Sequence, residues 1–560
     1  MNNKFIASIV LVFIILFQVE VSANSNINLA KTKEDRYAEL AKNIEIFTSL
    51  YRELNSYYVD DLDPNIVMKS AIDGMLEELD PYTNYIPSSD IDDYEFQTTG
   101  KYGGIGAIIG EKDGNVFVRQ PYEGSPAQKA GLLSGDIILE IDGKSANNKK
   151  SEDIRQLLLG QPNTPVTLKI NRAITSDTLT FTFNREQINI GNVPYYGILK
   201  DDIGYIRLDQ FTEDASLNVA NALKDLKSKN TLKGIVLDLR NNPGGLLQEA
   251  VGICNIFIDK GMEVVETRGK VQDVNKKYMT NSKAIDTETP LIVLINEGSA
   301  SASEIVSGVI QDYDRGLVIG QRTFGKGLVQ IPRPLPYKAR LKVTAYKYYI
   351  PSGRCIQAID YSNRDNEGKA PIIADSLRKV FYTKSGRPVK DGAGIEPDLK
   401  LEEEVFAPIS ISLYTKDLYF KYANIYRNAH PKLDSNKIFS LSDDEFNQFI
   451  EFIADKEYDY TTKTEDMLSS LIETAKDESY YSGISDALDV LKSNMKHDKN
   501  QDVVKHKTQI KALLESEIAS RYQYQKGKIK VELKYDNEVS KAMEILKDQS
   551  EYNKMLTVTQ

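Results

Sequence analysis

Histidine and cysteine are scarce in this sequence, which limits the chemistry that it can carry. The 560 residues include three His and two Cys. No CxxC or HExxH pattern occurs, and His430, His497 and His506 are isolated, so we expect no metal site and no cofactor. Cys254 and Cys355 lie far apart in the chain, and we interpret each as a small buried hydrophobe rather than as half of a disulfide.

Long basic runs are also absent. Lys and Arg total 70 against 81 Asp and Glu, which gives a formal net charge of −11. A chain without a basic block attracts nucleic acid weakly, so we expect no nucleic-acid partner. The hydrophobic fraction of 41% and the charged fraction of 27% are those of an ordinary globular protein. Since domains average roughly 100–200 residues, the chain is too long for a single core.

The N-terminus carries the pattern of a secretory signal. The apolar run "FIASIVLVFIILF" (5–17) is short for a membrane span and suits the apolar part of a signal peptide. "VSA" (21–23) fits a small-x-small cleavage site, so we expect cleavage after Ala23. No Cys lies nearby, which argues against a lipoprotein. We therefore expect an exported protein, periplasmic or associated with the cell envelope, which an uncleaved signal would anchor in the inner membrane.

Four further segments follow the signal, each with its own hydrophobic pattern. The first and the last place apolar residues at three- and four-residue spacings, as helices do. Between them come short β-rich runs separated by Gly, Asp and Asn, and then alternating strands and helices that predict a largely parallel sheet. The expected organisation is a signal peptide (1–23), an N-terminal helical region (24–97), a small β domain (98–188), an α/β domain (189–403) and a C-terminal helical region (404–560).

A candidate nucleophile lies in the stretch "EGSASASEI" (297–305). The apolar run "PLIVLIN" precedes it and another apolar run follows, so the pattern predicts a strand-to-helix turn near Ser301. A serine at such a turn is where several hydrolases place a nucleophile. The letters "SASE" also fit a capping box, in which Ser301 would merely cap its helix. The α/β segment contains no histidine, so a Ser-His-Asp site cannot be built within that segment.

A neutral lysine is the remaining base of suitable strength. Burial lowers the pKa of a lysine because it disfavours the charged form. Lys326 in "GLVIGQRTFGKGLVQI" (316–331) lies between two glycines and beside apolar runs, and Gln330 follows where it could orient the amine. A lone "GKG" is more often a solvated turn, so the assignment depends on the joint pattern.

The sequence also offers donors for an oxyanion. The amide of Ala302 would lie at the start of a helix, where unpaired N–H groups and the helix dipole favour negative charge. A second donor could come from "DLRNNPGG" (238–245), where a buried strand ends in a Gly-rich loop that opens a helix. Taken alone, this loop could also be a turn that serves only the fold.

Three stretches together resemble one family, the C-terminal processing peptidases, also called tail-specific proteases. They are "DLRNNPGGLLQEAV", "NEGSASASEIVSGVIQDYDRGLVIGQRTFGKGLVQ" and "YYIPSGRCIQ", within a resemblance that covers about residues 40 to 400. The resemblance implies a multidomain α/β fold: a crotonase/ClpP-like α/β protease core with an inserted PDZ domain and helical N- and C-terminal regions. It implies a Ser301–Lys326 dyad with Gln330 as orienting residue, and oxyanion donors at the amides of Gly245 and Ala302. Cys355, where the family often has Ser, is the departure that we notice.

The segment 98–188 resembles the PDZ domain that these proteases carry. "SPAQKAGLLSGDIILEIDG" (125–143) is similar to a PDZ core, and "GGIGA" (103–107) would be its carboxylate-binding loop. The amides of Ile105, Gly106 and Ala107 would then hold the terminal carboxylate of a peptide that adds as a strand to the sheet edge.

The expected function is an exported serine endopeptidase that grips polypeptide C-terminal tails and cleaves through an acyl-enzyme, without metal or nucleotide. Two alternatives stay open, a protease-like binding protein that has lost catalysis and a crotonase-like acyl-thioester enzyme. The resemblance also leaves room for a homodimer or higher oligomer and for an adaptor protein that delivers substrates.

Overall fold

A computed structural model of the protein describes residues 35–172, 175–270, 275–434, 437–495 and 499–557. The chain divides into two compact units, residues 1–85 and 86–560. The expected signal peptide (1–23) lies outside the described residues. In the described part of the chain, no helix has both the length and the apolar character that crossing a bilayer requires.

The first unit is helical where it is described. Residues 35–57 form one helix, and α2 (Pro64–Glu77) forms a second. Asp63 begins α2 as its N-cap, since its side chain accepts from the amide of Asn65 at 2.8 Å, and Pro64 occupies the first turn. Leu76 is the one buried hydrophobic side chain among the described residues of this unit, so the unit has little core of its own.

The second unit begins with a small β domain. Its sheet has the strand order β3-β4-β5-β7-β8, and the short β6 pairs with β5. Alternate residues of these strands are buried, which gives a core that includes Val116, Val118, Val166 and Leu168. β3 pairs only with β4, so its other edge is open within the described residues. The elements are η1 (Ser88–Asp90), α3 (Ile91–Thr99), β2 (Lys101–Gly104), β3 (Ala107–Lys112), β4 (Asn115–Pro121), α4 (Pro126–Lys129), β5 (Asp136–Ile141), β6 (Lys144–Ser145), α5 (Ser151–Leu158), β7 (Pro165–Arg172), β8 (Asp177–Asn184) and β9 (Glu186–Asn189), after β1 (Asn84–Ile86) at the unit boundary.

The α/β domain is built on a six-stranded sheet of order β10-β11-β12-β15-β16-β21, in which all strands except β10 run parallel. Its central strands β12, β15 and β16 are buried at every position because both faces of the sheet are covered. Val293 of β15 faces the core that contains α6, α7 and α8, while its neighbours Ile292 and Leu294 face a second core on the other side. The elements are β10 (Tyr195–Ile198), η2 (Lys200–Asp202), β11 (Ile203–Arg207), α6 (Ala215–Lys229), β12 (Gly234–Asp238), α7 (Leu247–Phe257), β15 (Leu291–Ile295), α8 (Ala302–Asp312), β16 (Leu317–Gly320) and β21 (Leu399–Lys400).

A second sheet of the α/β domain carries the segment that follows Lys326. β17 and β18 form an antiparallel hairpin, and β13 pairs with both β18 and β14. A separate pair, β19 and β20, precedes the last strand of the central sheet. The elements are β13 (Glu263–Gly269), β14 (Lys276–Met279), β17 (Leu328–Pro334), η4 (Pro336–Lys338), β18 (Arg340–Tyr349), η5 (Asp375–Leu377), β19 (Val380–Tyr382) and β20 (Pro388–Lys390).

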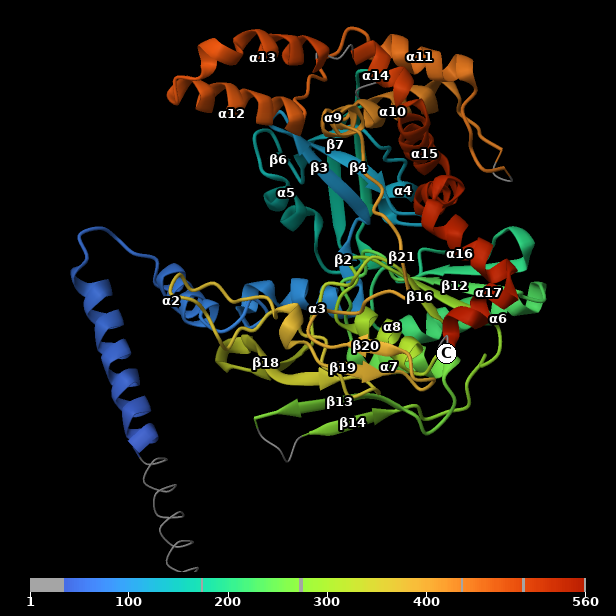
Figure 1. The fold of residues 1–560 in the computed structure, drawn as a ribbon. Coiled ribbons are helices and arrows are strands. Elements are labelled where there is room, and N and C mark those ends of the chain that lie inside the picture. Colours follow the sequence, from blue (N-terminus) through green and yellow to red (C-terminus); the bar gives the residue numbers. More distant parts are fainter. Residues whose placement is uncertain (1–34, 173–174, 271–274, 435–436, 496–498, 558–560) are drawn as a thin grey trace, which may run out of the picture. The chain divides into compact units, whose positions relative to one another are not determined.

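The C-terminal helical region has two parts. α9, α10, α11, α14 and α15 share a core rich in aromatic residues, in which Tyr419 stacks on Phe449. α16 and α17 instead pack on the central sheet, where Ile545, Leu546 and Tyr552 complete its second core, and Figure 1 shows both helices beside β12 and β16. The elements are α9 (Pro408–Thr415), α10 (Leu418–Ala429), α11 (Asp443–Ile453), α12 (Lys463–Asp477), α13 (Tyr481–Met495), α14 (Lys499–Lys505), α15 (Lys507–Tyr535), α16 (Asn537–Lys547) and α17 (Gln549–Leu556).

Candidate active site

Ser301 lies at a tight turn between the buried strand β15 and the buried helix α8. Its backbone has φ 54° and ψ −110°, a conformation that serine rarely adopts. Four hydrogen bonds hold it. The Ser301 N–H donates to Glu304 Oε2 at 2.7 Å, and the Ser301 carbonyl accepts from the Tyr348 hydroxyl at 3.2 Å and from the N–H groups of Glu304 and Ile305 at 2.9 Å each. A strained turn that its surroundings fix in this way is typical of functional sites.

The capping-box pattern predicted at this turn is only half used. The side chains of Ser301 and Glu304 are arranged as a capping box at the start of α8. Glu304 accepts the hydrogen bond from the Ser301 N–H, but the Ser301 hydroxyl makes no cap hydrogen bond in the described part of the chain. The Glu304 N–H donates to the Ser301 carbonyl at 2.9 Å, so this amide does not depend on the Ser301 hydroxyl.

The serines on either side of Ser301 are fully committed to the fold. Ser299 Oγ donates to the Leu239 carbonyl at 2.8 Å, and Ser303 Oγ donates to the Asn242 carbonyl at 2.9 Å. Both serines are completely buried, whereas Ser301 is half-buried. Of the three hydroxyls, that of Ser301 is the one placed to meet a substrate.

The loop "DLRNNPGG" closely approaches the serine turn. It follows β12, which is parallel to β15, and the carboxyl ends of parallel strands meet at one edge of a sheet. Gly244 has φ 96°, and a Cβ there would lie 2.9 Å from Ser301 Cβ and 2.7 Å from the Ala300 carbonyl. The Asn242 carbonyl fixes this approach by accepting from the Ala300 N–H at 3.0 Å. Glycine is therefore required at 244 by conformation and by space.

Two amides at this junction, those of Gly245 and Ala302, have no hydrogen-bond acceptor among the described residues. Their neighbours are paired, since the Gly244 N–H donates to Asn242 Oδ1 and the Leu246 N–H donates to the Phe211 carbonyl. Ala302 is the first residue of α8, where the helix dipole adds positive potential. The two amides assigned from the sequence as oxyanion donors thus come from adjoining segments, and the assignment itself stays a prediction.

Substitution of Gly244 by alanine tests this junction. We expect Gly244→Ala to lower kcat by about 10²–10³-fold, since its Cβ would displace the serine turn and the loop that carries a predicted oxyanion donor. Gly261→Ala is the matched control, because Gly261 also has a positive φ of 86° but no atom lies within 4 Å of the place that its Cβ would occupy. Peptidase kinetics and thermal melting of both variants provide the measurement. Equal kcat in the two variants would contradict the assignment.

Lys326 lies in the loop between β16 and β17 and is half-buried. The glycines on both sides of it are required because the chain packs against the stretch "RCIQA" (354–358). A Cβ on Gly325 would lie 2.4 Å from Ala358 Cβ, and one on Gly327 would lie 2.7 Å from the Gln357 nitrogen. Gln357 Oε1 accepts from the Gly327 N–H at 2.8 Å. The third stretch of the family pattern therefore serves to hold the lysine loop.

A single carboxylate oxygen joins the two predicted dyad segments. Glu304 Oε2 accepts from the N–H of Ser301 at 2.7 Å and from the N–H of Lys326 at 2.9 Å. The backbone of the proposed base is therefore adjacent to that of the proposed nucleophile. The capping-box pattern in the sequence indicates Glu304 only as part of a helix cap. It does not indicate the contact of Glu304 with the lysine loop.

Gln330 lies on β17 at a β-bulge, because the register with β18 shifts between Val329 and Gln330. Bulges beside active sites redirect a side chain. Gln330 Nε2 donates to Thr344 Oγ1 at 3.0 Å. The side-chain oxygen of Gln330 then remains as a hydrogen-bond acceptor, which an orienting residue needs. The predicted role of Gln330 toward Lys326 stays a prediction.

The expected carboxylate loop of the β domain also has unpaired amides. Ile105 and Gly106 lie between β2 and β3, and their N–H groups donate to no acceptor among the described residues, although both carbonyls accept. Ala107 begins β3, the open edge strand. A groove of about 640 Å³ runs beside this loop. Ile105, Ile109 and Leu158 line its apolar part, and charged side chains such as Glu95 and Arg155 line the rest. Loop, open edge and apolar groove form the arrangement that binds a peptide C-terminus.

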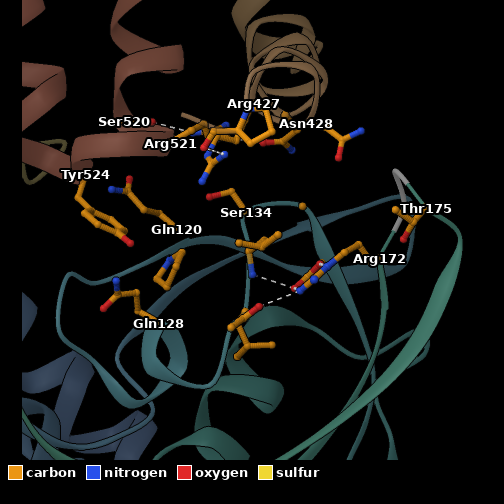
Figure 2. Close-up of a pocket in the computed structure, with 18 residues that line it drawn as sticks. Gln120, Gln128, Ser134, Arg172, Thr175, Arg427, Asn428, Ser520, Arg521 and Tyr524 are labelled. Atoms are coloured by element: carbon orange, nitrogen blue, oxygen red, sulfur yellow. Dashed lines mark hydrogen bonds and ion pairs between the residues drawn. The ribbon is translucent and has the colours of Figure 1, made fainter. Parts of the chain in front are cut away.

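A second cavity, of about 380 Å³, lies between the β domain and the helical region. Figure 2 shows Ser134 and Arg172 of the β domain on one side and Arg427 and Arg521 of α10 and α15 on the other. Beside it, Asp417 at the start of α10 accepts from Lys112 of β3 at 2.6 Å. None of the predicted site residues lines this cavity, so we assign it no part of the chemistry.

The two cysteines and the described histidines have other surroundings than the predicted dyad residues. Cys254 and Cys355 are both free thiols, and burial raises the pKa of each. His430 stacks on Tyr426 in the helical region, His506 is the N-cap of α15, and His497 lies outside the described residues. Within the described residues no group of three or more His, Cys, Asp or Glu could hold a metal ion.

Comparison with known proteins gives three family matches. The profile of "Peptidase family S41" matches residues 202–362, and that of "PDZ domain" matches residues 117–172. The profile of "Probable PDZ-protease, C-terminal helical domain" matches residues 409–546.

Individual relatives agree with these matches. A "Carboxy-terminal-processing protease" from Bartonella bacilliformis is 39% identical over 330 residues, which cover 58% of this chain and 74% of that protein. A "Probable CtpA-like serine protease" from Staphylococcus aureus is 37% identical over 355 residues, which cover 63% of this chain and 69% of that protein. Among solved structures, a "photosystem II D1 C-terminal processing protease" is 26% identical with a TM-score of 0.35, over 64% of this chain and 93% of that chain.

Proposed function

Because the chain belongs to the carboxy-terminal-processing proteases of peptidase family S41, we propose that it is an exported serine endopeptidase that grips polypeptide C-termini with its PDZ domain. One observation carries the proposal. Ser301 stands at a strained turn with its hydroxyl uncommitted, beside the unpaired amides of Gly245 and Ala302.

The proposed chemistry is acyl transfer. Ser301 Oγ attacks the scissile carbonyl carbon while neutral Lys326 Nζ takes the hydroxyl proton. The amides of Gly245 and Ala302 stabilise the oxyanion, and the protonated lysine then gives its proton to the leaving amine. Water hydrolyses the acyl-enzyme by the same steps, with Lys326 again as base. Gln330 orients the lysine amine.

The proposed substrate recognition uses the PDZ groove. The peptide adds as a strand to β3, its last side chain enters the apolar groove beside Ile105, and its carboxylate accepts from the amides of Ile105, Gly106 and Ala107. An apolar C-terminal residue is favoured for this reason. Membership of a peptidase family favours this function over the acyl-thioester enzyme and over the binding protein without catalysis.

A pair of peptides tests tail recognition. We expect a substrate with a free apolar C-terminus to have a KM at least about tenfold below that of the same peptide amidated, because the amide lacks the charge that the loop binds. Gly106→Ala should remove the difference, since its Cβ would lie 2.4 Å from Ser125 Cβ. Gly124→Ala is the control, with φ 76° and open space around its Cβ position. Equal KM values for the two peptides would contradict tail recognition.

Location and assembly complete the proposal. The signal pattern at 1–23 supports export, and we propose the domain boundaries stated from the sequence. A homodimer is supported by the helix over 35–57, because four of its exposed apolar residues recur at heptad spacing: Tyr37, Leu40, Ile44 and Phe47. Measuring the mass of the protein in solution tests whether it is a dimer. Delivery of substrates by an adaptor stays a prediction.

A further inference from the structure

We propose that Glu304 is the positioning residue that sets the separation of Ser301 and Lys326. The inference rests on the proposed dyad and adds a residue to it. Glu304 lies in the first turn of α8, and its side chain is completely buried. Burying a carboxylate costs free energy unless hydrogen-bond donors surround it. The groups that donate to Glu304 therefore indicate what this buried carboxylate does beside the dyad.

Four hydrogen bonds converge on this carboxylate, two on each oxygen. Oε2 accepts from the N–H groups of Ser301 at 2.7 Å and Lys326 at 2.9 Å. Oε1 accepts from the Gly325 N–H at 2.8 Å and from the Thr323 hydroxyl at 2.6 Å. Oε2 thus binds the backbone of Ser301 and Lys326, and Oε1 binds the residues that come just before Lys326 in the chain.

The Oε1 side is itself fixed by the rest of the domain. Thr323 Oγ1 accepts from the Ile395 N–H at 2.7 Å and gives its single proton to Glu304 Oε1, so the hydroxyl is held from both sides. Gly394 makes room for this pair, because a Cβ there would lie 2.6 Å from Thr323 Oγ1 and 3.1 Å from Glu304 Oε1. Burial raises the pKa of the Glu304 carboxyl, and the four donors only partly offset the rise.

An ordinary helix cap would not need these contacts. The capping box at α11 has the same core geometry, since Glu445 Oε2 accepts from the Ser442 N–H at 2.7 Å, but its other oxygen accepts from a side chain, the Tyr426 hydroxyl at 2.6 Å, and not from a second stretch of backbone among the described residues. At α8 the same glutamate position also binds a loop more than twenty residues later in the chain. The lysine loop is the feature that distinguishes Glu304 from a cap.

Glutamine at 304 tests the role because it keeps the shape but offers one acceptor oxygen in place of two. We expect Glu304→Gln to lower kcat by roughly 10²-fold and to slow labelling of Ser301 by a fluorophosphonate, with KM for a tailed peptide unchanged, since misplacement of reacting groups costs about this much. Glu445→Gln is the matched control for lost capping and should leave kcat and labelling unchanged. A kcat for Glu304→Gln within threefold of the wild type, or an equal loss in Glu445→Gln, overturns the proposal.

A second pair of variants covers the case in which Glu304→Gln does not fold. Thr323→Val removes one donor to Oε1 and should lower kcat about fivefold to tenfold, while Thr323→Ser keeps the hydroxyl and should restore it. Full kcat in Thr323→Val overturns the proposal. Ser301→Ala in the same assay distinguishes failure of the dyad from failure of the positioning role. Cleavage that survives in Ser301→Ala refutes the dyad. An inactive Ser301→Ala together with a fully active Glu304→Gln refutes only the positioning role.

Discussion

Ser301→Ala is expected to abolish peptide cleavage, with a loss of roughly 10⁴-fold or more in kcat, and to abolish labelling by a fluorophosphonate. The reason is specific to this hydroxyl. The hydroxyls of Ser299 and Ser303 donate hydrogen bonds to buried backbone carbonyls, whereas the Ser301 hydroxyl makes no such bond in the described chain. Alanine keeps the strain at φ 54° that serine already bears, so the turn should persist.

The controls for this variant separate chemistry from folding. Ser228→Ala, on an exposed face of α6, should keep full activity and full labelling. Binding of a tailed peptide should be the same in both variants, because the PDZ groove does not involve Ser301. Cleavage by Ser301→Ala at more than about one hundredth of the wild-type rate would remove Ser301 as the nucleophile.

Lys326→Met is expected to lower kcat by about 10³–10⁴-fold while leaving peptide binding intact. Methionine keeps the length and apolar character of the side chain but cannot take a proton. Lys326→Arg should lose as much, because a guanidinium stays protonated and cannot act as a base. The measurement is kcat and KM for all variants at one pH.

Arginine is the decisive member of this set. A lysine that acted only through its positive charge would be replaced by arginine at little loss, so an active Lys326→Arg would refute the general-base role. Lys347→Met is the matched control, since Lys347 is exposed on β18 and is not part of the lysine loop. It should retain wild-type kcat.

The sequence was most informative where local pattern and burial agree. The fold class is confirmed by the matches to the S41 and PDZ families. The apolar run "PLIVLIN" became β15, which is buried at every position because helices cover both faces of the sheet. Glycines at 244, 325 and 327 were visible as motif letters, and the structure gives the reason, which is close backbone approach.

The role of Glu304 could not be read from the sequence for a physical reason. The S/T-x-x-E pattern stands at the start of α8, α11 and α12 (301–304, 442–445 and 462–465), and each time the glutamate accepts from the N–H of the Ser or Thr three residues before it. Only tertiary burial distinguishes them, because residues 323–326 come from a different part of the chain and donate to the first of the three glutamates. Local letters carry no information about such a distant partner.

The division of the C-terminal helices was likewise hidden. Amphipathic periodicity in "SKAMEILKDQ" predicts a helix but does not say what its apolar face meets. In the structure Ile545 and Leu546 meet the central sheet, while α9, α10, α11, α14 and α15 form a core of their own. A single boundary at 404 therefore does not separate the two cores, because α16 and α17 return to the α/β domain.

Helices α16 and α17 make the central sheet depend on a segment that is far from its strands in the sequence. Tyr552 of α17 bonds through its hydroxyl to both the N–H and the carbonyl of Leu291, the first residue of the strand that leads to Ser301. During synthesis this strand emerges from the ribosome some 260 residues before that tyrosine. We therefore expect a nascent chain to have no peptidase activity until α17 has been synthesised, because the strand that leads to Ser301 lacks this support before then.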